Sequence, residues 1–299
     1  MFYLSTHTFI LILFISICFS YILKDWAYDF QDSDSSVGNQ FMNLIQGYGA
    51  THPIAPAAGN HEACTTCDGI NELPLSSKNF TQYRARLHSV TLHAGVNAGT
   101  NSNIYYSFNQ GLVHYLVFSA EAYIYAVSTD FINNQLAFMK QDLANVNRTD
   151  TPWVVGLVHK DWTMEPQAYA DFAPILENGG VDVSFVGHVH FYDRRIPYDS
   201  VTGQSDNASV SADGSTYTNP KYMVTIVTGA SGDRELDDSC KKATNPSYTC
   251  SQNYGYGFFT AVNATTATWT FKTIKPMGNG PADYSDSLTI VQANHGPRN

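Results

Sequence analysis

Charged residues are scarce in this sequence, and basic ones especially so. Charged side chains make up 14% of its 299 residues, and 16 Lys and Arg are outnumbered by 26 Asp and Glu, for a formal net charge of −10 at pH 7. Nucleic acids and anionic membranes are bound by basic patches, so we expect neither as a partner. If the substrate is an anion, so acidic a chain needs a local positive charge, and metal ions are the most economical source.

Low-complexity tracts and internal repeats are also missing, which excludes a repeat array and a wholly disordered chain. The hydrophobic content of 43% is instead sufficient for a substantial buried core. A chain of this length forms one large domain or two ordinary ones.

Long hydrophobic runs are limited to one, FILILFISICFSYIL at residues 9–23. It is shorter than the roughly 20 residues that span a bilayer, and no Lys or Arg precedes it. Three interpretations remain open: a signal peptide, a membrane anchor, or a buried strand of the folded domain. A membrane is a partner only if residues 9–23 act as an anchor.

Cysteine is limited to five residues, four of which fall into two pairs. Cys64 and Cys67 lie in CTTC, Cys240 and Cys250 bracket a polar loop, and Cys18 lies in the apolar run. Two loop disulfides and one odd cysteine are the interpretation we favour. Zinc binding by CTTC is the alternative, but it needs a second closely spaced pair, and the other two cysteines are too far apart in sequence.

Four NxS/T sites offer acceptors for glycans if the chain enters the secretory pathway. The low charge also implies a surface built from neutral polar groups, which suits secretion. Together with the cysteine pairs, these features predict a secreted or lumenal glycoprotein. The acceptor residues are Asn79, Asn147, Asn207 and Asn263.

Hydrophobic periodicity predicts a mixture of helices and strands. Three helices are expected, at 38–48, 131–146 and 167–177, the second preceded by the capping candidates Ser128, Thr129 and Asp130. Hairpins are expected at 104–121 and 258–274, and buried strands at 154–158, 181–187 and 223–229. Mixed strands alternating with helices predict a layered α/β domain in which one sheet packs on another.

Each of four apolar runs ends at a residue that commonly binds metal ions. SYIL leads towards Asp25, IAPAAG precedes Asn60, VVGLV precedes His159, and VDVSFVG precedes His188 and His190. Alone, each is more often an ordinary polar loop residue. Because ligand sites gather beyond the carboxyl ends of strands, the four runs together deliver these side chains to one place. The combination predicts a metal site.

At this point the sequence resembles the purple acid phosphatases, a family within the calcineurin-like metallophosphoesterases. Their five ordered blocks are DxG, GDxxY, GNH followed by Asp or Glu, VxxH, and GHxH. GNHE at 59–62 and GHVH at 187–190 are complete, whereas KDWAY has Lys24 in place of glycine and GLVH has Gly156 in place of valine. DxG has no counterpart, since residues 1–24 contain no aspartate. The resemblance covers nearly everything after Lys24.

This resemblance implies an α/β fold, a layered α/β/β/α sandwich with mixed sheets, here lacking the first strand and helix. It divides the chain into three parts. Residues 1–23 form an apolar segment that is either signal-like or a residual strand, residues 24–290 form a partial metallophosphoesterase catalytic domain, and residues 291–299 form a tail.

The resemblance also implies a dinuclear centre of Fe(III) and a divalent Fe, Zn or Mn ion. One aspartate is expected to bridge both ions, the ferric ion takes one tyrosine and one histidine, and the divalent ion takes an asparagine and two histidines. In the same order, the positions that match are Asp25, then Tyr28 and His190, then Asn60, His159 and His188.

His61 matches the family histidine that contacts the phosphoryl oxygens or the leaving group. The implied activity is that of an acid phosphatase that hydrolyses small-molecule phosphomonoesters. Because the DxG aspartate is absent, the alternative is a truncated non-catalytic relative whose partial metal site binds phosphate without hydrolysing it. No catalytic role carries over to Lys160 or Asp161, where the sequence HKDW diverges from the family.

Overall fold

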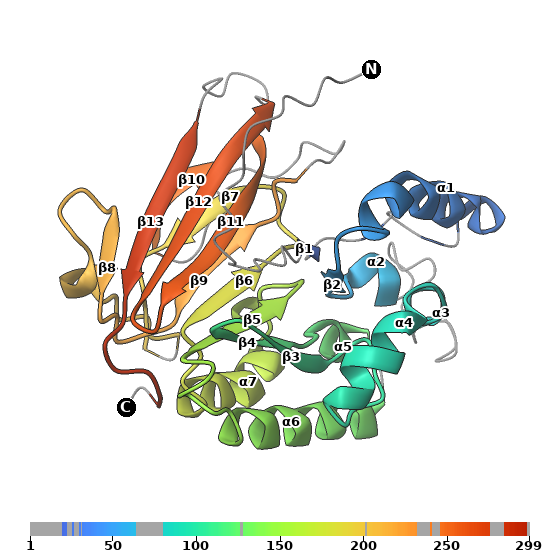
Figure 1. Ribbon diagram of the computed structural model, residues 1–299, viewed down its shortest axis with the longest axis horizontal. Coiled ribbons are helices and arrows are strands. Elements are labelled where there is room, and N and C mark those ends of the chain that lie inside the picture. The colour runs from blue at the N-terminus through green and yellow to red at the C-terminus, as the bar shows by residue number, and fades with distance from the viewer. Residues whose placement is uncertain are drawn as a thin grey trace, which may run out of the picture.

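The computed structural model describes residues 20–22, 26, 30, 32–63, 80–125, 128–200, 202–231, 240, 246–275 and 284–297. These residues form a seven-stranded, a four-stranded and a two-stranded sheet. The two larger sheets pack on each other, and helices lie on the outer side of the seven-stranded one (Figure 1). The predicted α/β class with mixed sheets and sheet-on-sheet packing is therefore confirmed.

The seven-stranded sheet contains the strands that lead into His159 of GLVH and into GHVH. Its order is β10-β7-β9-β6-β5-β4-β3. The neighbours β4, β5, β6 and β9 pair in parallel, β3 pairs antiparallel with β4, and β7 pairs antiparallel with both β9 and β10. The predicted hairpin at 104–121 and all three predicted buried strands lie in it. The strands are β3 (Tyr106–Gln110), β4 (Val113–Val117), β5 (Trp153–Val158), β6 (Val183–Val186), β7 (Tyr192–Arg195), β9 (Val224–Thr228) and β10 (Ser247–Ser251).

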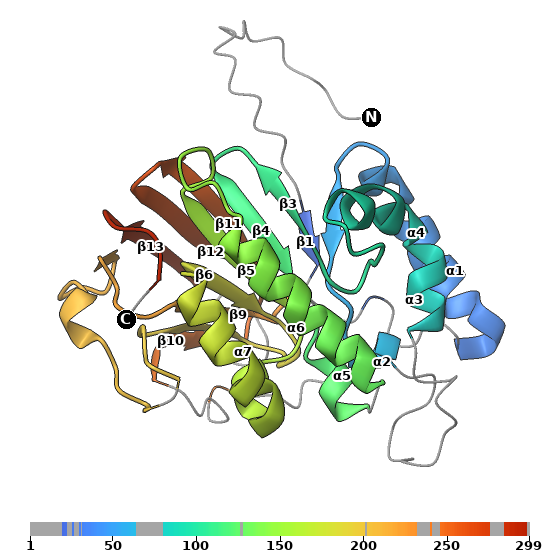
Figure 2. The same cartoon turned by 90° about the horizontal axis from the view of Figure 1, so that it is seen from below.

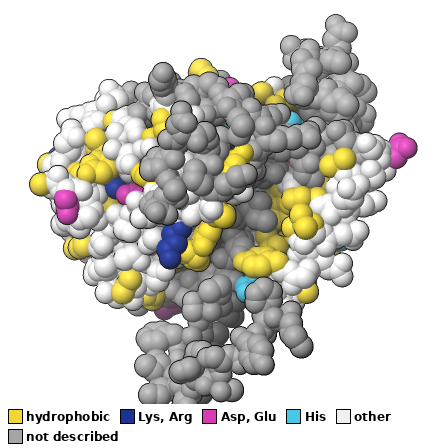
Figure 3. All heavy atoms as spheres, turned by 90° about the horizontal axis from the view of Figure 1, so that it is seen from above, with side chains coloured by type: hydrophobic (Ala, Val, Ile, Leu, Met, Phe, Trp, Pro, Cys, Tyr) yellow, Lys and Arg dark blue, Asp and Glu magenta, His cyan; other side chains and the backbone are white. Residues whose placement is uncertain are grey.

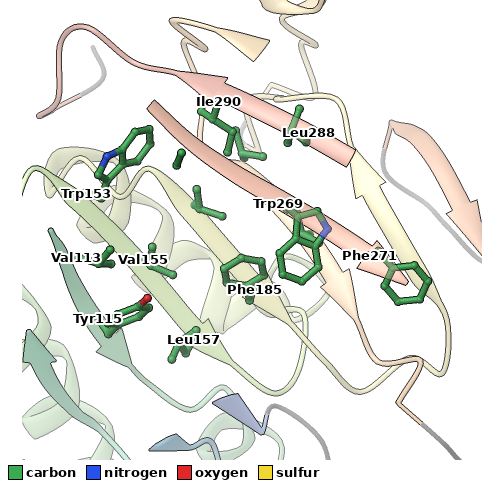
Figure 4. Packing of buried hydrophobic residues seen from close by; sticks show 14 of the residues in the cluster. Val113, Tyr115, Trp153, Val155, Leu157, Phe185, Trp269, Phe271, Leu288 and Ile290 are labelled. Atoms are coloured by element: carbon green, nitrogen blue, oxygen red, sulfur yellow. The ribbon is translucent and has the colours of Figure 1, made fainter. Parts of the chain in front are cut away.

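The four-stranded sheet has the order β11-β12-β13-β8 and contains the second predicted hairpin. Its strands are β11 (Tyr254–Asn263), β12 (Thr266–Lys275), β13 (Ser285–Val291) and β8 (Thr216–Thr218). Figure 4 shows side chains from both sheets meeting between them, with Trp153 and Phe185 on one side and Trp269, Leu288 and Ile290 on the other. This apolar layer fixes the orientation of the seven-stranded sheet.

Two long helices, α6 (Thr129–Ala144) and α7 (Pro166–Asn178), cover the opposite face of the seven-stranded sheet (Figure 2). Met139 of α6 and Phe172 of α7 are fully buried against the strands. Both helices agree with the sequence prediction to within two residues. Ser128 is the N-cap of α6, and its side chain accepts a hydrogen bond from the Phe131 amide at 3.3 Å.

A smaller unit beside the sandwich is built from the N-terminal third of the chain. The strands β1 (Ser20–Ile22) and β2 (Ile54–Pro56) pair in parallel. The predicted helix at 38–48 lies inside α1 (Asp32–Gly49), where 33–35 have positive φ and delay the regular helix. The other helices of the described ranges are α2 (Asn60–Ala63), α3 (Thr81–Arg86), α4 (His88–Val90), the π-helix η2 (Thr91–Gly95) and α5 (Glu121–Ile124), with short 3₁₀ turns η3 (Trp162–Met164) and η4 (Asn207–Ser209) elsewhere.

The predicted disulfide between Cys240 and Cys250 is present, whereas Cys18, Cys64 and Cys67 lie outside the described residues. None of the helices in the described ranges has the length and apolar composition needed to cross a membrane. On the face drawn in Figure 3, few charged side chains are visible among the described residues, in keeping with the low charge of the sequence.

Candidate metal centre

Three of the predicted ligands are placed by the ends of strands. His159 directly follows β5, and His188 follows the adjacent parallel strand β6 after Gly187. Asn60 begins α2, which the chain enters from β2 in the smaller sheet. The loops beyond the carboxyl ends of β5 and β6 thus open towards the helix that carries Asn60, as expected for a ligand site in an α/β fold.

These three side chains meet at a single point. His159 Nε2 and His188 Nδ1 each lie 3.0 Å from Asn60 Oδ1, and the two imidazole rings have centroids 5.2 Å apart at an interplanar angle of 68°. His159 is buried, and the other two are half-buried. Residues separated by about a third of the chain therefore converge, although no local pattern links them.

The donor set suits a divalent transition ion. Imidazole nitrogens and amide oxygens are ligands that zinc, iron and manganese accept. Within the described residues, no three His, Cys, Asp or Glu side chains gather closely enough to bind a metal ion. The third member of this cluster is instead the amide of Asn60, so the cluster has the composition that the motifs predict.

The other predicted site residues are placed less completely. Asp25 and Tyr28 lie outside the described residues. His61 follows Asn60 in α2, and His190 lies two residues beyond His188; both are half-buried. The structure therefore brings Asn60, His159 and His188 together and places His61 and His190 next to members of that cluster.

Glu62 connects the two N-terminal motifs. Its buried carboxylate accepts hydrogen bonds from the Trp26 amide at 2.8 Å through Oε1 and from the Gly59 amide at 2.9 Å through Oε2. Trp26 is itself buried and follows Asp25 directly. The acid of GNHE thus fixes the backbone beside Asp25 relative to the turn that presents Asn60, a role that the motif alone did not reveal.

The loop of GHVH has an unusual backbone conformation. His188 has a φ of 66°, in the left-handed region that residues other than glycine seldom adopt. The Gly187 amide donates to the His159 carbonyl at 2.8 Å, and the Val189 amide donates to the Gly187 carbonyl at 2.8 Å. The loops after β5 and β6 are therefore joined through their backbones as well as through Asn60.

A buried ion pair beside the site was not predicted. Arg195 Nη2 lies 2.6 Å from Asp161 Oδ2, and Arg195 Nε lies 3.3 Å from Asp193 Oδ2. Burial raises the pKa of Asp161, but the Arg195 charge and the hydrogen bonds from Thr163 outweigh burial, so the pKa is lowered. Burial dominates at Asp193 and raises its pKa. The only sequence signal was a pair of arginines, Arg194 and Arg195, in a short segment between apolar runs.

The matches to known protein families agree with this architecture. The model described as calcineurin-like phosphoesterase matches residues 25–192. The chain belongs to the calcineurin-like phosphoesterases. A second model, described as iron/zinc purple acid phosphatase-like protein C, matches residues 222–279 of this phosphoesterase. The resemblance to purple acid phosphatases inferred from the five blocks is thereby confirmed.

Similar proteins extend the match over most of the phosphoesterase chain. Acid phosphatase type 7 of Danio rerio is 29% identical over 92% of this chain and 62% of its own length. Purple acid phosphatase 18 of Arabidopsis thaliana is 28% identical over 77% of this chain and 48% of its own length. The chain thus spans less than two thirds of the length of these relatives.

A solved structure of purple acid phosphatase from yellow lupin (Lupinus luteus) seeds has the same fold as this phosphoesterase. It superposes with a TM-score of 0.67 at 21% identity, over 93% of this chain and 47% of the lupin chain. At that level of identity the likeness concerns the fold, and it supports the layered sandwich described above.

Proposed function

We propose that this chain is a metal-dependent acid phosphatase that hydrolyses small phosphomonoesters. The observation that carries the proposal is the convergence of His159 Nε2 and His188 Nδ1 on Asn60 Oδ1, at 3.0 Å each. Membership of the calcineurin-like phosphoesterases and the names of the relatives point to the same activity.

In this proposal Asn60, His159 and His188 hold the divalent ion, which is Fe, Zn or Mn. Asp25, Tyr28 and His190 would hold Fe(III), and Asp25 would be shared with the divalent ion. Two observations support this assignment: His190 lies two residues beyond His188, and the amide of Trp26, the residue after Asp25, donates to the Glu62 carboxylate of the GNHE motif. When bound, such a pair of ions supplies positive charge for a phosphate and lowers the pKa of a coordinated water.

The chain's own residues contribute orientation and a proton. His61 follows Asn60 in α2 and is half-buried, and in this proposal it contacts a bound phosphoryl group, as the matching family histidine does. In its protonated form it donates to a phosphoryl oxygen and then to the departing alkoxide, which requires acidic conditions. Glu62 holds the Gly59 amide and thereby fixes the turn that carries both residues.

The direct test is phosphate release from para-nitrophenyl phosphate between about pH 4 and pH 7. Chelation and His188→Ala should each abolish activity, whereas His93→Ala should leave it unchanged, because His93 is an exposed histidine on η2. Activity that survives both chelation and His188→Ala would refute the proposal. His61→Ala should lower kcat most at the acidic end of this range, where the imidazole is protonated, and more for an alkyl phosphate, whose alkoxide needs a proton, than for para-nitrophenyl phosphate.

Metal analysis separates the phosphatase from the alternative, a non-catalytic relative with a partial site. The alternative is motivated by the missing DxG aspartate in residues 1–24. Two ions per chain together with phosphate release support the phosphatase. One ion per chain, phosphate binding and no release support the alternative.

We also propose a secreted or lumenal location. The Cys240–Cys250 disulfide requires an oxidising compartment, and the three NxS/T asparagines within the described residues, Asn147, Asn207 and Asn263, are all exposed. When the protein is expressed in a secreting eukaryotic cell, glycosidase treatment should lower its apparent molecular mass. A protein that remains in the cytosol without glycans would contradict this location.

A further inference from the structure

The GHVH loop rests against the backbone of Gly229, a residue outside all five motif blocks. Gly229 directly follows β9, the parallel neighbour of β6. A Cβ atom built on Gly229 would collide with the carbonyl oxygen of Val189 and lie 2.8 Å from its carbonyl carbon. The obstacle is backbone, so no side-chain rotation can relieve the contact. Only a residue without a side chain allows this approach.

The peptide that touches Gly229 lies between two predicted ligands. Val189 is flanked by His188 and His190, so a shift of the Val189 carbonyl moves the backbone of both histidines. His188 is also the residue with a φ of 66°, a conformation that persists only where the surroundings impose it. Those surroundings include the hydrogen bond from Gly187 to the His159 carbonyl on one side and Gly229 on the other.

Gly229 itself is not needed for its conformational freedom. It is absent from the residues with positive φ, so the left-handed conformation that favours glycine is not the reason for glycine here. The space for the Val189 carbonyl is therefore what this position supplies. A methyl group at residue 229 should therefore act by colliding with the Val189 carbonyl.

We propose that Gly229 is a positioning residue for the metal centre: it lets the Val189 peptide pack directly on the end of β9 and so sets the positions of His188 and His190. This inference rests on the proposed function, because it assumes that these histidines bind metal. Residues that hold metal ligands in place typically change metal affinity by about 10-fold to 100-fold when mutated.

The test compares Gly229→Ala with Gly47→Ala. Gly47 lies on the exposed side of α1 with no atom within 4 Å of a built Cβ, so it receives the same methyl group without any contact. Metal-free protein is titrated with Zn²⁺, and with Co²⁺ followed by visible absorption. Gly229→Ala should weaken Zn²⁺ binding at least about tenfold and alter the Co²⁺ spectrum, whereas Gly47→Ala should change neither.

A second pair of variants keeps the inference testable if Gly229→Ala does not fold. Val189→Gly frees the backbone between the two histidines, and Val189→Ala removes most of the same partly buried side chain but keeps the backbone restrained. Zn²⁺ affinity should fall further in Val189→Gly than in Val189→Ala. Equal affinities in this pair, or wild-type affinity in folded Gly229→Ala, would overturn the positioning role.

The Zn²⁺ titrations also distinguish failure of the proposed function from failure of the positioning role. If wild-type protein binds Zn²⁺ no better than His188→Ala, the metal centre itself is refuted, and with it the role of Gly229. If wild-type protein binds Zn²⁺ and His188→Ala does not, while folded Gly229→Ala binds as well as the wild type, the proposed function stands and only the positioning role is wrong.

Discussion

Replacing Arg195 with methionine should destabilise the protein by an amount that depends on pH. Arg195 is 4% exposed and contacts two carboxylates, those of Asp161 and Asp193, whose side chains are 4% and 0% exposed. Methionine preserves much of the length and apolar volume of arginine but removes its charge. Both carboxylates then remain buried without the cation that compensates them.

The expected loss at neutral pH is about 3–5 kcal/mol, the cost of breaking a buried ion pair by removing one partner. In the wild type the pKa of Asp161 is lowered, so its contribution to stability is present above its unfolded pKa and is lost as pH falls through the lowered value. In the variant burial is opposed only by hydrogen bonds, so the pKa of Asp161 should rise. The variant therefore loses stability as pH rises.

The difference between the two proteins should consequently grow from acidic to neutral pH, by about 1.4 kcal/mol for each unit by which the variant's pKa values exceed those of the wild type. Urea unfolding at about pH 4.5 and pH 7.5 measures this difference. Tryptophan fluorescence is a suitable probe, because all four tryptophans are at most 4% exposed.

Lys140→Met is the matched control, since it removes an exposed cation from α6 and should change stability by no more than about 0.5 kcal/mol. A loss below about 1 kcal/mol for Arg195→Met at neutral pH would mean that the pair acts like an exposed ion pair. A loss that is the same at both pH values would refute the reasoning about the carboxylates.

Three further substitutions test other contacts. Glu62→Gln removes the charge that accepts from the Trp26 and Gly59 amides, so urea unfolding should show a loss of about 1.5–3 kcal/mol and Zn²⁺ titration a weaker affinity. Ser128→Ala should cost about 1 kcal/mol in urea unfolding through the lost cap of α6. His295→Ala removes hydrogen bonds to Asp182 at 3.1 Å and to the Ala264 carbonyl at 2.7 Å, so it should lower stability by about 1–3 kcal/mol without changing Zn²⁺ affinity.

The elements that sequence predicted well are those whose burial is complete or whose caps are local. The strands β5, β6 and β9 are continuous apolar runs, as expected for parallel strands covered on both faces. Helix α6 combines a regular apolar spacing with the Ser128 cap. In both cases the information lies within a few residues of the element itself.

The strands that were missed owe their burial to distant partners. β7 has the sequence YDRR, and its two arginines are buried only because Asp286 pairs with Arg194 and Asp161 with Arg195. β11 begins at Tyr254, four residues before the predicted hairpin. The prediction began too late because Gly255 and Gly257 interrupt the apolar alternation that indicates a strand. The rings of Phe271 and Trp269 cover these glycines from β12, which no local pattern can reveal.

The candidate site shows the same division between local and distant information. Strand ends and motif spacing predicted that Asn60, His159 and His188 would converge, and they do. Motif spacing did not predict how the loops are held. Glu62 belongs to the GNHE motif, but its partner Trp26 is distant in sequence, as Gly229 is from Val189, so the motif does not reveal either contact.

These supports act on backbone rather than on the ligand side chains, and this has a consequence for how metal binds. Glu62 holds two amides, Gly187 donates to the carbonyl of His159, and Gly229 receives the carbonyl of Val189. Each of these contacts joins two groups of the protein and uses no side-chain atom of a predicted ligand. Because protein groups alone make these contacts, we expect the ligand loops to stay ordered without the ions. Metal binding should then not require folding of the site, and the free energy of unfolding should rise with metal concentration as mass action predicts, with one dissociation constant per site. A site that folded only with its ion would instead show a large change in secondary structure on chelation, as small zinc domains do.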